Sequence, residues 1–391
     1  MDKIPFLGID REYKEQRELI LDTHDKIMSS GKVMNGFYTE QLEKAIARRT
    51  NTRHAVAVHS GTNALEISGI AIRKHSLLTR HDPIRPIAII PALTYPATAN
   101  AFINAGYRLH FIDVTSYGTL DFSKVPREEY DVLVHVGLYG QPVAYSDLHA
   151  EYNRSNGRWH VDDAAQSFGA IEEESAHPIF SIRCLSFDPT KVLANTGNGG
   201  MIVTNSDEIA TYAKNARSNG SPSSFNQSGT NSRMSETDCA TLLIKLNKLD
   251  EWLERRRKIA LYYISRLHEQ FGMRVVYNRA SPIIHGAWQK FVLDVDRRDE
   301  LAEYLKAHLI ETKVHYNKAL HEMPAISLYD NPGMLSVASA LARRVISLPI
   351  HPMLTDLEVE RVAMVVRGFY DAKGPQAKTI RKTSSTLVAV R

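Results

Sequence analysis

The segment Ser60–Leu65 (SGTNAL) combines a glycine with two hydroxyl side chains directly after a short apolar run. Where such a turn opens a helix, backbone N–H groups and the hydroxyl of Thr62 can point at one anion, typically a phosphate. A Ser-Gly-Thr sequence is also common in strand-to-helix turns that bind nothing. This segment alone therefore leaves phosphate binding and a purely structural turn both open.

An acidic pair and a lysine follow two later apolar runs. Asp162 and Asp163 can hold a protonated nitrogen of a ligand, although an aspartate that caps a helix is at least as common. Lys191 ends the segment Ser186–Lys191 (SFDPTK) and precedes the glycine-rich stretch Asn195–Gly200. A lysine that is desolvated among small residues can act as an amine nucleophile, although most lysines are solvated surface charges.

The three motifs together match the needs of one cofactor. Pyridoxal 5′-phosphate requires an anion cup for its phosphate, a carboxylate that keeps its pyridine nitrogen protonated and a lysine for a Schiff base. Other chemistries lack their motifs, because the sequence has no His-Glu-x-x-His or Cys-x-x-Cys spacing, no Gly-x-Gly-x-x-Gly after the first run, no Gly-x-x-x-x-Gly-Lys and no Gly-x-Ser-x-Gly. We therefore expect this cofactor and no metal.

These motifs need strands whose carboxyl ends meet, and the sequence between about residues 54 and 205 predicts them. Short apolar runs alternate with helical patterns there; the runs are His54–His59, Pro86–Ile90, Leu109–Ile112, Asp131–His135, Trp159–Val161, Cys184–Phe187 and Met201–Thr204. Near-continuous hydrophobicity is typical of strands buried on both faces of a parallel sheet. The pattern predicts an α/β fold that binds its ligand at the carboxyl ends of the strands.

The second half of the chain has a different pattern. Ser235–Asp238 is expected to cap a helix that continues through Asp250–Lys258. Further on, the sequence predicts a strand at Trp288–Val295, a helix at Asp299–His308, a strand at Thr312–His315 and a closing helix from Thr355. We predict a large domain over residues 1–254, a small α+β domain over residues 255–372 and a basic, disordered tail over residues 373–391.

Length and composition narrow the class of protein. With 391 residues, 43% hydrophobic and 24% charged, the chain is an ordinary globular protein with room for two or three domains. Two cysteines, Cys184 and Cys239, are too few for a disulfide framework and predict reduced, buried thiols. The N-terminus lacks the apolar core of a signal peptide, and no run approaches the roughly 18–20 apolar residues of a membrane helix. We expect a cytoplasmic protein without a membrane partner.

The net charge of +4 originates in the tail. Residues 373–391 carry five basic side chains and no acidic one. The rest of the chain therefore has 43 basic and 44 acidic residues, a net charge of −1. The basicity therefore gives no support for a nucleic-acid partner, and the arginine run after Asp250 is expected to be a solvated helix face.

The motifs also occur in the order of a known family. The chain resembles the DegT/StrS-type family of pyridoxal-phosphate-dependent nucleotide-sugar aminotransferases over roughly residues 4–370. The resemblance rests on Ile4–Leu7, Ser60–Leu65, Pro91–Asn100, Leu138–Pro142, Asp163–Gln166, Ser186–Lys191, Gly229–Met234, His315–Tyr316 and Ser347–Ile350. It implies the fold type I aminotransferase architecture, in which helices sandwich a mostly parallel central sheet and a smaller α+β domain follows.

The resemblance implies roles around the cofactor ring. Lys191 is expected to form the Schiff base and to carry protons, and Asp163 to pair with the pyridine nitrogen. Gln166 is expected to hydrogen-bond the cofactor. Tyr95 matches the aromatic residue that stacks on the ring, and a core aromatic is the alternative for this position.

The resemblance also implies how the phosphate is held. Gly61, Thr62 and Ser186 are expected to bind it, with a favourable helix dipole. Asn231 matches a residue that the neighbouring subunit contributes, which implies a two-fold homodimer with shared active sites.

The implied reaction is a ping-pong transamination. An amino acid, commonly L-glutamate in this family, gives its amino group to the keto-sugar of a nucleoside-diphosphate sugar, and an amino sugar for a glycan or metabolite is formed. His315 and His321 match positions near the substrate, where a structural histidine is an equal alternative. Asp188 and Asn198 depart from the family's commoner residues, which leaves the sugar open.

Two other functions stay open beside it. The chain could aminate another ketone such as a cyclitol, or it could be a non-catalytic regulatory relative that binds cofactor or sugar. Relatives that perform dehydration carry histidine in place of Lys191, so the lysine favours transamination.

Overall fold

The computed structural model of the protein describes most of the chain. The described residues are 2–80, 86–127, 130–142, 151, 158–170, 180–220, 227–267, 273–277, 283–330 and 332–371. The predicted basic tail over residues 373–391 lies outside them.

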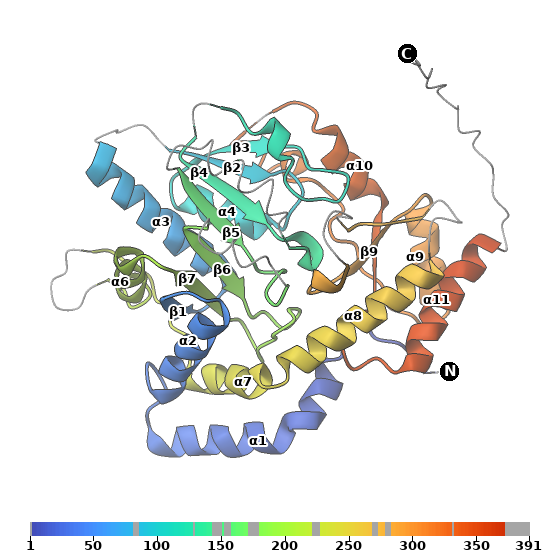
Figure 1. Cartoon of the computed structure of the whole chain (residues 1–391), viewed down its shortest axis with the longest axis horizontal. Coiled ribbons are helices and arrows are strands. Elements are labelled where there is room, and N and C mark those ends of the chain that lie inside the picture. The colour runs from blue at the N-terminus through green and yellow to red at the C-terminus, as the bar shows by residue number, and fades with distance from the viewer. Residues whose placement is uncertain are drawn as a thin grey trace, which may run out of the picture.

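A seven-stranded sheet forms the centre of the larger part of the molecule (Figure 1). In spatial order its strands are β1 (His54–Val58), β7 (Gly200–Thr204), β6 (Ile182–Ser186), β5 (Trp159–Asp163), β4 (Val132–Val136), β2 (Ile87–Pro91) and β3 (Arg108–Ile112). Neighbouring strands from β6 to β3 pair in parallel, whereas β7 pairs antiparallel with both β1 and β6. Each of the seven predicted runs forms one of these strands, and the predicted mostly parallel α/β sheet is confirmed.

Helices cover both faces of this sheet because successive strand residues point to opposite sides. Val56 and Val58 of β1 share a core with one layer, whereas Ala55 and Ala57 belong to the core on the other face. The first layer contains α3 (Gly61–Arg80), α4 (Pro96–Asn104) and α6 (Asp207–Ala216); the second contains α2 (Phe37–Arg49) and α7 (Glu236–Leu246), with α1 (Ile9–Ser30) packed on α7.

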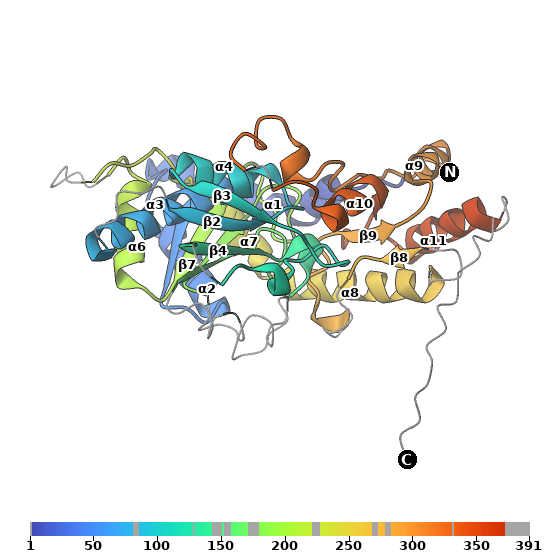
Figure 2. The ribbon, with the colours of Figure 1, turned by 90° about the horizontal axis from the view of Figure 1, so that it is seen from above.

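A second core lies at the C-terminal end of the molecule. Its three-stranded antiparallel sheet has the order β10 (Val345–Leu348), β9 (Phe291–Asp294) and β8 (Arg274–Val275), and its helices are α9 (Arg298–Ala307) and α11 (Asp356–Asp371). The helix α10 (Ser336–Arg344) precedes β10, but its buried residues Ala338, Leu341 and Ala342 belong to the core of the large sheet. Ile4, near the N-terminus, is fully buried in this core and pairs with Ile310. The long helix α8 (Leu249–Arg266) runs from the large sheet to this core, and Figure 2 shows it from above.

Two sequence predictions about this half are wrong in detail. The helix that begins after Ser235 does not continue through Lys258, because the chain turns at Asn247 before α8 begins. The turn is needed because α7 packs on α1 and α2, whereas α8 extends away toward the second core (Figure 1). The predicted strand Thr312–His315 is reduced to a single bridge between Lys313 and Ser347.

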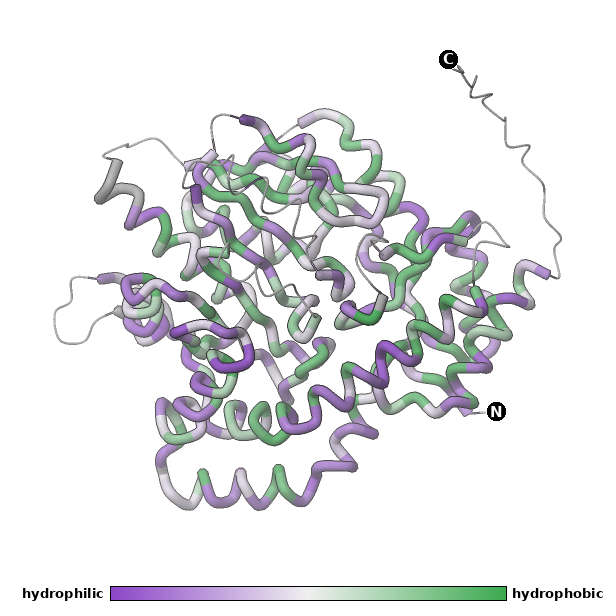
Figure 3. Tube along the Cα trace, viewed as in Figure 1, coloured by the Kyte–Doolittle hydropathy of each residue, from purple (hydrophilic) through white to green (hydrophobic). Residues whose placement is uncertain are grey.

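Ser235 accepts a hydrogen bond from the backbone of Asp238 and so caps α7 as predicted. The charge run of α8, which colours much of that helix hydrophilic in Figure 3, was expected to be a solvated helix face. This expectation is correct for Glu251, Glu254 and Lys258, which are exposed, and wrong for Arg256, which is buried because its guanidinium donates to the carbonyls of Trp288 and Ile350. The predicted domain boundary after residue 254 falls within α8, and the division into domains stays a prediction. None of the described helices is long and apolar enough to cross a bilayer.

We expect the protein to lose stability in mild acid. Burial lowers the pKa of His160 and of His351 to about 4 in the folded protein, against about 6.5 in an unfolded chain. Below pH 6.5 these two histidines become protonated in the unfolded chain, whereas in the folded protein they stay neutral until about pH 4. Each histidine should therefore remove roughly 2 kcal/mol from the free energy of unfolding between pH 7.5 and pH 5.

Urea unfolding at these two pH values checks this expectation. The variant His160→Gln lacks one titrating ring and should lose about 2 kcal/mol less than the parent over the same interval. An equal loss in both proteins would show that His160 is not held neutral.

Candidate active site

The register of three strands builds the anion cup. Gly200, the first residue of β7, lies opposite Val58 of β1 on one side and opposite Ser186 of β6 on the other. This places the turn after β1, which opens α3 at Gly61, beside Ser186 at the end of β6. A side chain at Gly200 would lie 2.3 Å from the carbonyl carbon of Ser60, so that only glycine allows this approach.

The cup combines the first turn of a long helix with two hydroxyl residues. Gly61 and Thr62 begin the 20-residue helix α3, whose free N–H groups and dipole favour an anion. Ser186 lies against Gly61, because a Cβ on Gly61 would be 2.7 Å from Cβ of Ser186. The three residues that sequence analysis selected for the phosphate are therefore neighbours in space.

A substitution tests this cup. In Gly61→Ala the added methyl group would push α3 away from Ser186, and we expect the dissociation constant for pyridoxal phosphate to rise by about tenfold or more. Gly197→Ala is the matched control, since a Cβ there meets no atom within 4 Å. Titration of the cofactor-free proteins, followed by absorbance, measures both constants. Equal weakening in the two variants would contradict the proposed cup.

Asp163 is a buried carboxylate at the carboxyl end of β5. Its Oδ2 accepts a hydrogen bond of 2.7 Å from the hydroxyl of Thr98 on α4, and its Oδ1 accepts one of 3.2 Å from the backbone of Ala165. Burial nevertheless raises the pKa of this carboxyl above its ordinary value. A cationic ring nitrogen beside it would offset the cost of burying the charge, which is the chemistry that the cofactor offers.

Its neighbour Asp162 faces the opposite side of the sheet. Asp162 is buried and pairs with Arg183 at 2.8 Å and with His135 at 3.5 Å. Its charge is thus neutralised by Arg183, and although burial opposes it, this positive charge lowers the pKa of Asp162. The two adjacent aspartates therefore separate into a structural one and one that is available to a ligand.

Lys191 lies in the loop after β6, in a half-buried position. Burial lowers the pKa of its ammonium group, and this effect outweighs the attraction of Asp163 and Asp188. Asp188 also shapes the loop, since its Oδ1 accepts hydrogen bonds from the backbone and the hydroxyl of Thr190 at 2.9 and 2.5 Å. A lysine with a lowered pKa is neutral more often and is therefore a better nucleophile and base.

The side chains of Gln166, Tyr316 and Tyr95 form a third part of the candidate site. Gln166 accepts a hydrogen bond from the backbone of Tyr139 at 3.0 Å and donates one to the hydroxyl of Tyr316 at 3.1 Å. The ring of Tyr316 is 5.8 Å from that of Tyr95, centre to centre. Tyr95 follows β2 and is 56% exposed, which excludes the core-aromatic alternative and leaves its ring free for a ligand.

The remaining predicted residues lie at different distances from this centre. His315 belongs to it, because the charges of Lys290 and Lys191 lower its pKa further after burial, to about 2, and its Nδ1 is 2.8 Å from the hydroxyl of Ser347. His321 is 3.3 Å from the hydroxyl of Ser339 on α10, a contact that suits a structural histidine. Asn231 is exposed, and its backbone pairs with Ser218.

Sequence reasoning missed three contributors to this site. Thr98 and Tyr316 lie within recognised motifs, but only the fold shows that they contact Asp163 and Gln166. Lys290 gave no signal, because a lysine beside the apolar strand β9 is expected at the surface. In the structure it is 4% exposed and close enough to Lys191 for the two charges to repel.

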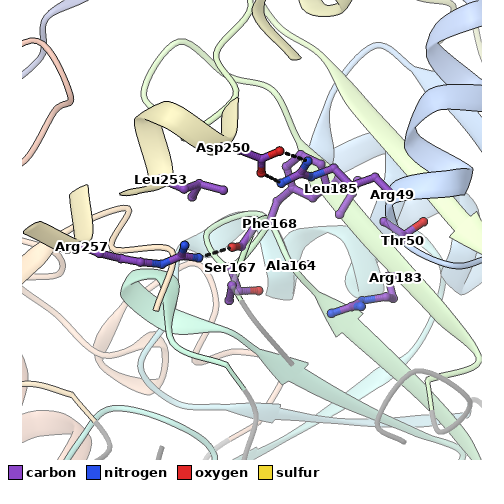
Figure 4. A pocket seen from close by; sticks show the side chains of 12 residues that line it. Arg49, Thr50, Ala164, Ser167, Phe168, Arg183, Leu185, Asp250, Leu253 and Arg257 are labelled. Atoms are coloured by element: carbon purple, nitrogen blue, oxygen red, sulfur yellow. Dashed lines mark hydrogen bonds and ion pairs between the residues drawn. The ribbon is translucent and has the colours of Figure 1, made fainter. Parts of the chain in front are cut away.

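The structure also has a cavity of about 390 Å³ on the face of the large sheet opposite to the anion cup. Leu185 lines it, and the next residue, Ser186, points to the cup. Figure 4 shows that two of the arginines around it are engaged by the protein: Arg49 pairs with Asp250, and Arg257 donates to the carbonyl of Gly169 at 3.2 Å. The third, Arg183, pairs with Asp162. Because Leu185 and Ser186 point to opposite faces of the sheet, this cavity lies on the other side of the sheet from the cup.

The described residues fit pyridoxal phosphate in three respects: a cup that a Cβ would fill, a buried carboxyl with a raised pKa and a lysine with a lowered one. Together with the mostly parallel sheet, they define the fold type I class of pyridoxal-phosphate-dependent enzymes. A sequence model described as the DegT/DnrJ/EryC1/StrS aminotransferase family matches residues 14–367. The chain belongs to this family and is a pyridoxal-phosphate-dependent aminotransferase.

Similar proteins cover nearly the whole chain. A dTDP-3-amino-3,4,6-trideoxy-alpha-D-glucose transaminase of Streptomyces venezuelae is 32% identical over 93% of this chain and 96% of its own length. A protein of Geobacillus stearothermophilus named pleiotropic regulatory protein is 30% identical over 94% and 98%. The crystal structure of S. venezuelae DesV in complex with a ketimine intermediate superposes with a TM-score of 0.85 at 32% identity, covering 95% of this chain and 99% of DesV.

Proposed function

We propose that the protein transfers an amino group from L-glutamate to the keto group of a nucleotide-linked sugar. The full-length similarity to the transaminase of S. venezuelae, with Lys191 and Asp163 together at the carboxyl edge of the sheet, carries this proposal. A UDP-2-acetamido-2-deoxy-3-oxo-D-glucuronate aminotransferase of Pseudomonas aeruginosa, 28% identical over 89% of the chain, supports the same substrate class. The product is an amino sugar for a glycan or a glycosylated metabolite.

Each residue of the site has a defined task in this reaction. When bound, pyridoxal phosphate would delocalise into its ring the electron pair that stays on the substrate carbon after that carbon loses a proton. Lys191 holds the cofactor and moves that proton, which its lowered pKa favours. Asp163 keeps the ring nitrogen protonated, and Thr98 orients the carboxylate. Gln166 and Tyr95 position the ring, while Gly61, Thr62 and Ser186 hold the phosphate.

We also propose that two copies share their active sites. Asn231 is exposed on its own subunit, so its side chain is available to the phosphate cup of a second copy. His315 and His321 are proposed to lie toward the sugar. A cytoplasmic location is consistent with both cysteines, Cys184 and Cys239, being buried and unpaired.

A regulatory role without turnover is the second candidate, and the name of the G. stearothermophilus relative favours it. A panel of ketones separates the candidates: 3-keto and 4-keto sugars linked to dTDP, UDP or GDP, and a keto-inositol, each with L-glutamate. Formation of 2-oxoglutarate with a nucleotide-linked sugar is expected. Formation with the keto-inositol alone would favour a cyclitol, and no formation with any ketone would favour regulation.

A further inference from the structure

A small cavity of about 90 Å³ is lined by Thr190, the residue that precedes Lys191. Thr190 and His315 line it, so it adjoins the loop that carries the proposed nucleophile. Three further lining residues are cationic and come from separate parts of the chain: Arg256 from α8, Lys290 from the residue before β9, and Lys313.

No carboxylate of the described residues lines this cavity. Lys290 is 4% exposed and donates to the side-chain oxygen of Gln289. Asp188 attracts it from nearby, but that carboxylate already accepts two hydrogen bonds from Thr190. Among the residues that the structure describes, the ammonium group of Lys290 is therefore buried without a dedicated counter-ion.

Arg256 is a second buried cation that lines the same cavity. It is 6% exposed, and its guanidinium donates to the carbonyls of Trp288 and Ile350 at 3.3 and 3.2 Å. Its Nε is buried and has no hydrogen-bond partner in the described structure. A buried donor of this kind costs free energy unless a ligand satisfies it.

Burial and the neighbouring positive charges lower the pKa of Lys290 well below its ordinary value, and burial lowers that of Arg256 to about 10. An anion between them would reverse both effects. In the cavity of about 390 Å³ shown in Figure 4, Arg49 pairs with Asp250 and Arg183 with Asp162, whereas Arg257 donates to the carbonyls of Gly286 and Gly169. Two of its three arginines therefore already have a carboxylate partner.

We propose that this cavity binds a carboxylate of the amino-acid donor through Lys290 and Arg256. The inference rests on the proposed function, since it assigns the donor to this side of Lys191. The volume is well below the roughly 300 Å³ of pockets that hold larger organic ligands, so it admits a carboxylate with a few waters and no sugar ring or nucleotide. A cation pair that holds a carboxylate next to Lys191 would also bring the donor's reacting carbon near that amine.

The test uses the cofactor-loaded enzyme and a carboxylate that cannot react. Calorimetry measures the dissociation constant of glutarate, and of propionate, for the parent protein, Lys290→Met, Lys290→Arg and the surface control Lys306→Met, whose side chain is 77% exposed. Methionine keeps the length of the side chain, and urea unfolding checks that each variant is folded. We expect Lys290→Met to weaken glutarate binding by about tenfold to a hundredfold, with Lys290→Arg within a few-fold of the parent and Lys306→Met unchanged.

The spectral titration of each protein with L-glutamate or L-alanine, without any keto-sugar, locates the carboxylate that is bound. Weakening with both amino acids and with propionate assigns the α-carboxylate, whereas weakening with L-glutamate and glutarate alone assigns the side-chain carboxylate. Equal glutarate affinity in the parent and Lys290→Met overturns the inference, and so does equal weakening by Lys290→Arg. Failure of the proposed function is a separate result: the amino acid converts the cofactor normally, but no keto-sugar is aminated.

Discussion

Lys191→Ala is expected to lower turnover by about 10⁴-fold or more and to remove the visible absorbance band of covalently held pyridoxal phosphate. The expectation follows from the two tasks that we propose for this amine, which are to attach the cofactor and to move the proton at the substrate carbon. Alanine removes both at once. The substitution leaves Gly61, Thr62 and Ser186, the residues proposed to hold the phosphate, unchanged, so the variant should still bind the cofactor non-covalently.

The comparison needs a lysine variant that leaves the site intact. Lys306→Ala changes a surface residue of α9 whose partner is Glu303 at 3.6 Å, and it should keep the turnover and the spectrum of the parent. Absorbance scans and steady-state rates on the three purified proteins give the result. A Lys191→Ala enzyme that retained the band and a tenth of the turnover would remove Lys191 from the mechanism.

Asp163→Asn is expected to lower turnover by about 10²–10³-fold while the protein stays folded. The asparagine keeps the size of the side chain and can still contact Thr98, but it carries no charge to hold a proton on the ring nitrogen. The ring then withdraws electrons less strongly from the reacting carbon. Rates of the half-reaction with L-glutamate alone measure this effect without depending on the identity of the sugar.

Asp162→Asn is the matched control, one residue away on the other face of β5. It breaks a buried pair with Arg183 and should therefore lower the free energy of unfolding by roughly 3 kcal/mol. The half-reaction rate of the folded fraction should change little. If the two variants showed the same pattern in rate and stability, the separation of a structural from a ligand-binding aspartate would be wrong.

Strand periodicity and motif order predicted the parts of the fold that local physics controls. Seven apolar runs became the seven strands of the main sheet, because strands buried on both faces need continuous hydrophobicity. The prediction of a strand at Thr312–His315 was wrong because this short segment has no clear pattern of apolar residues. Its bridge to Ser347 depends on tertiary packing. The break between α7 and α8 is likewise set by the two cores that these helices join.

The positions of the candidate site residues were predictable where one residue depends on its own type and place in the chain. Gly61 and Lys191 follow a strand and Asp163 ends one, and parallel strands bring such ends together. Contacts between distant segments were not predictable in this way. Lys290 lies 99 positions from Lys191, and only the packing of the second core against the loop after β6 makes its charge a neighbour of that amine.

The most direct test of the account follows the nitrogen atom itself. The enzyme loaded with pyridoxal phosphate is mixed with L-glutamate labelled with nitrogen-15 and with the nucleotide-linked keto-sugar that reacts best in the panel. Mass spectrometry of the sugar product is expected to show one labelled nitrogen, together with one 2-oxoglutarate for each amino sugar. Label that stays in glutamate, with no nitrogen-15 in any sugar product, would contradict the account.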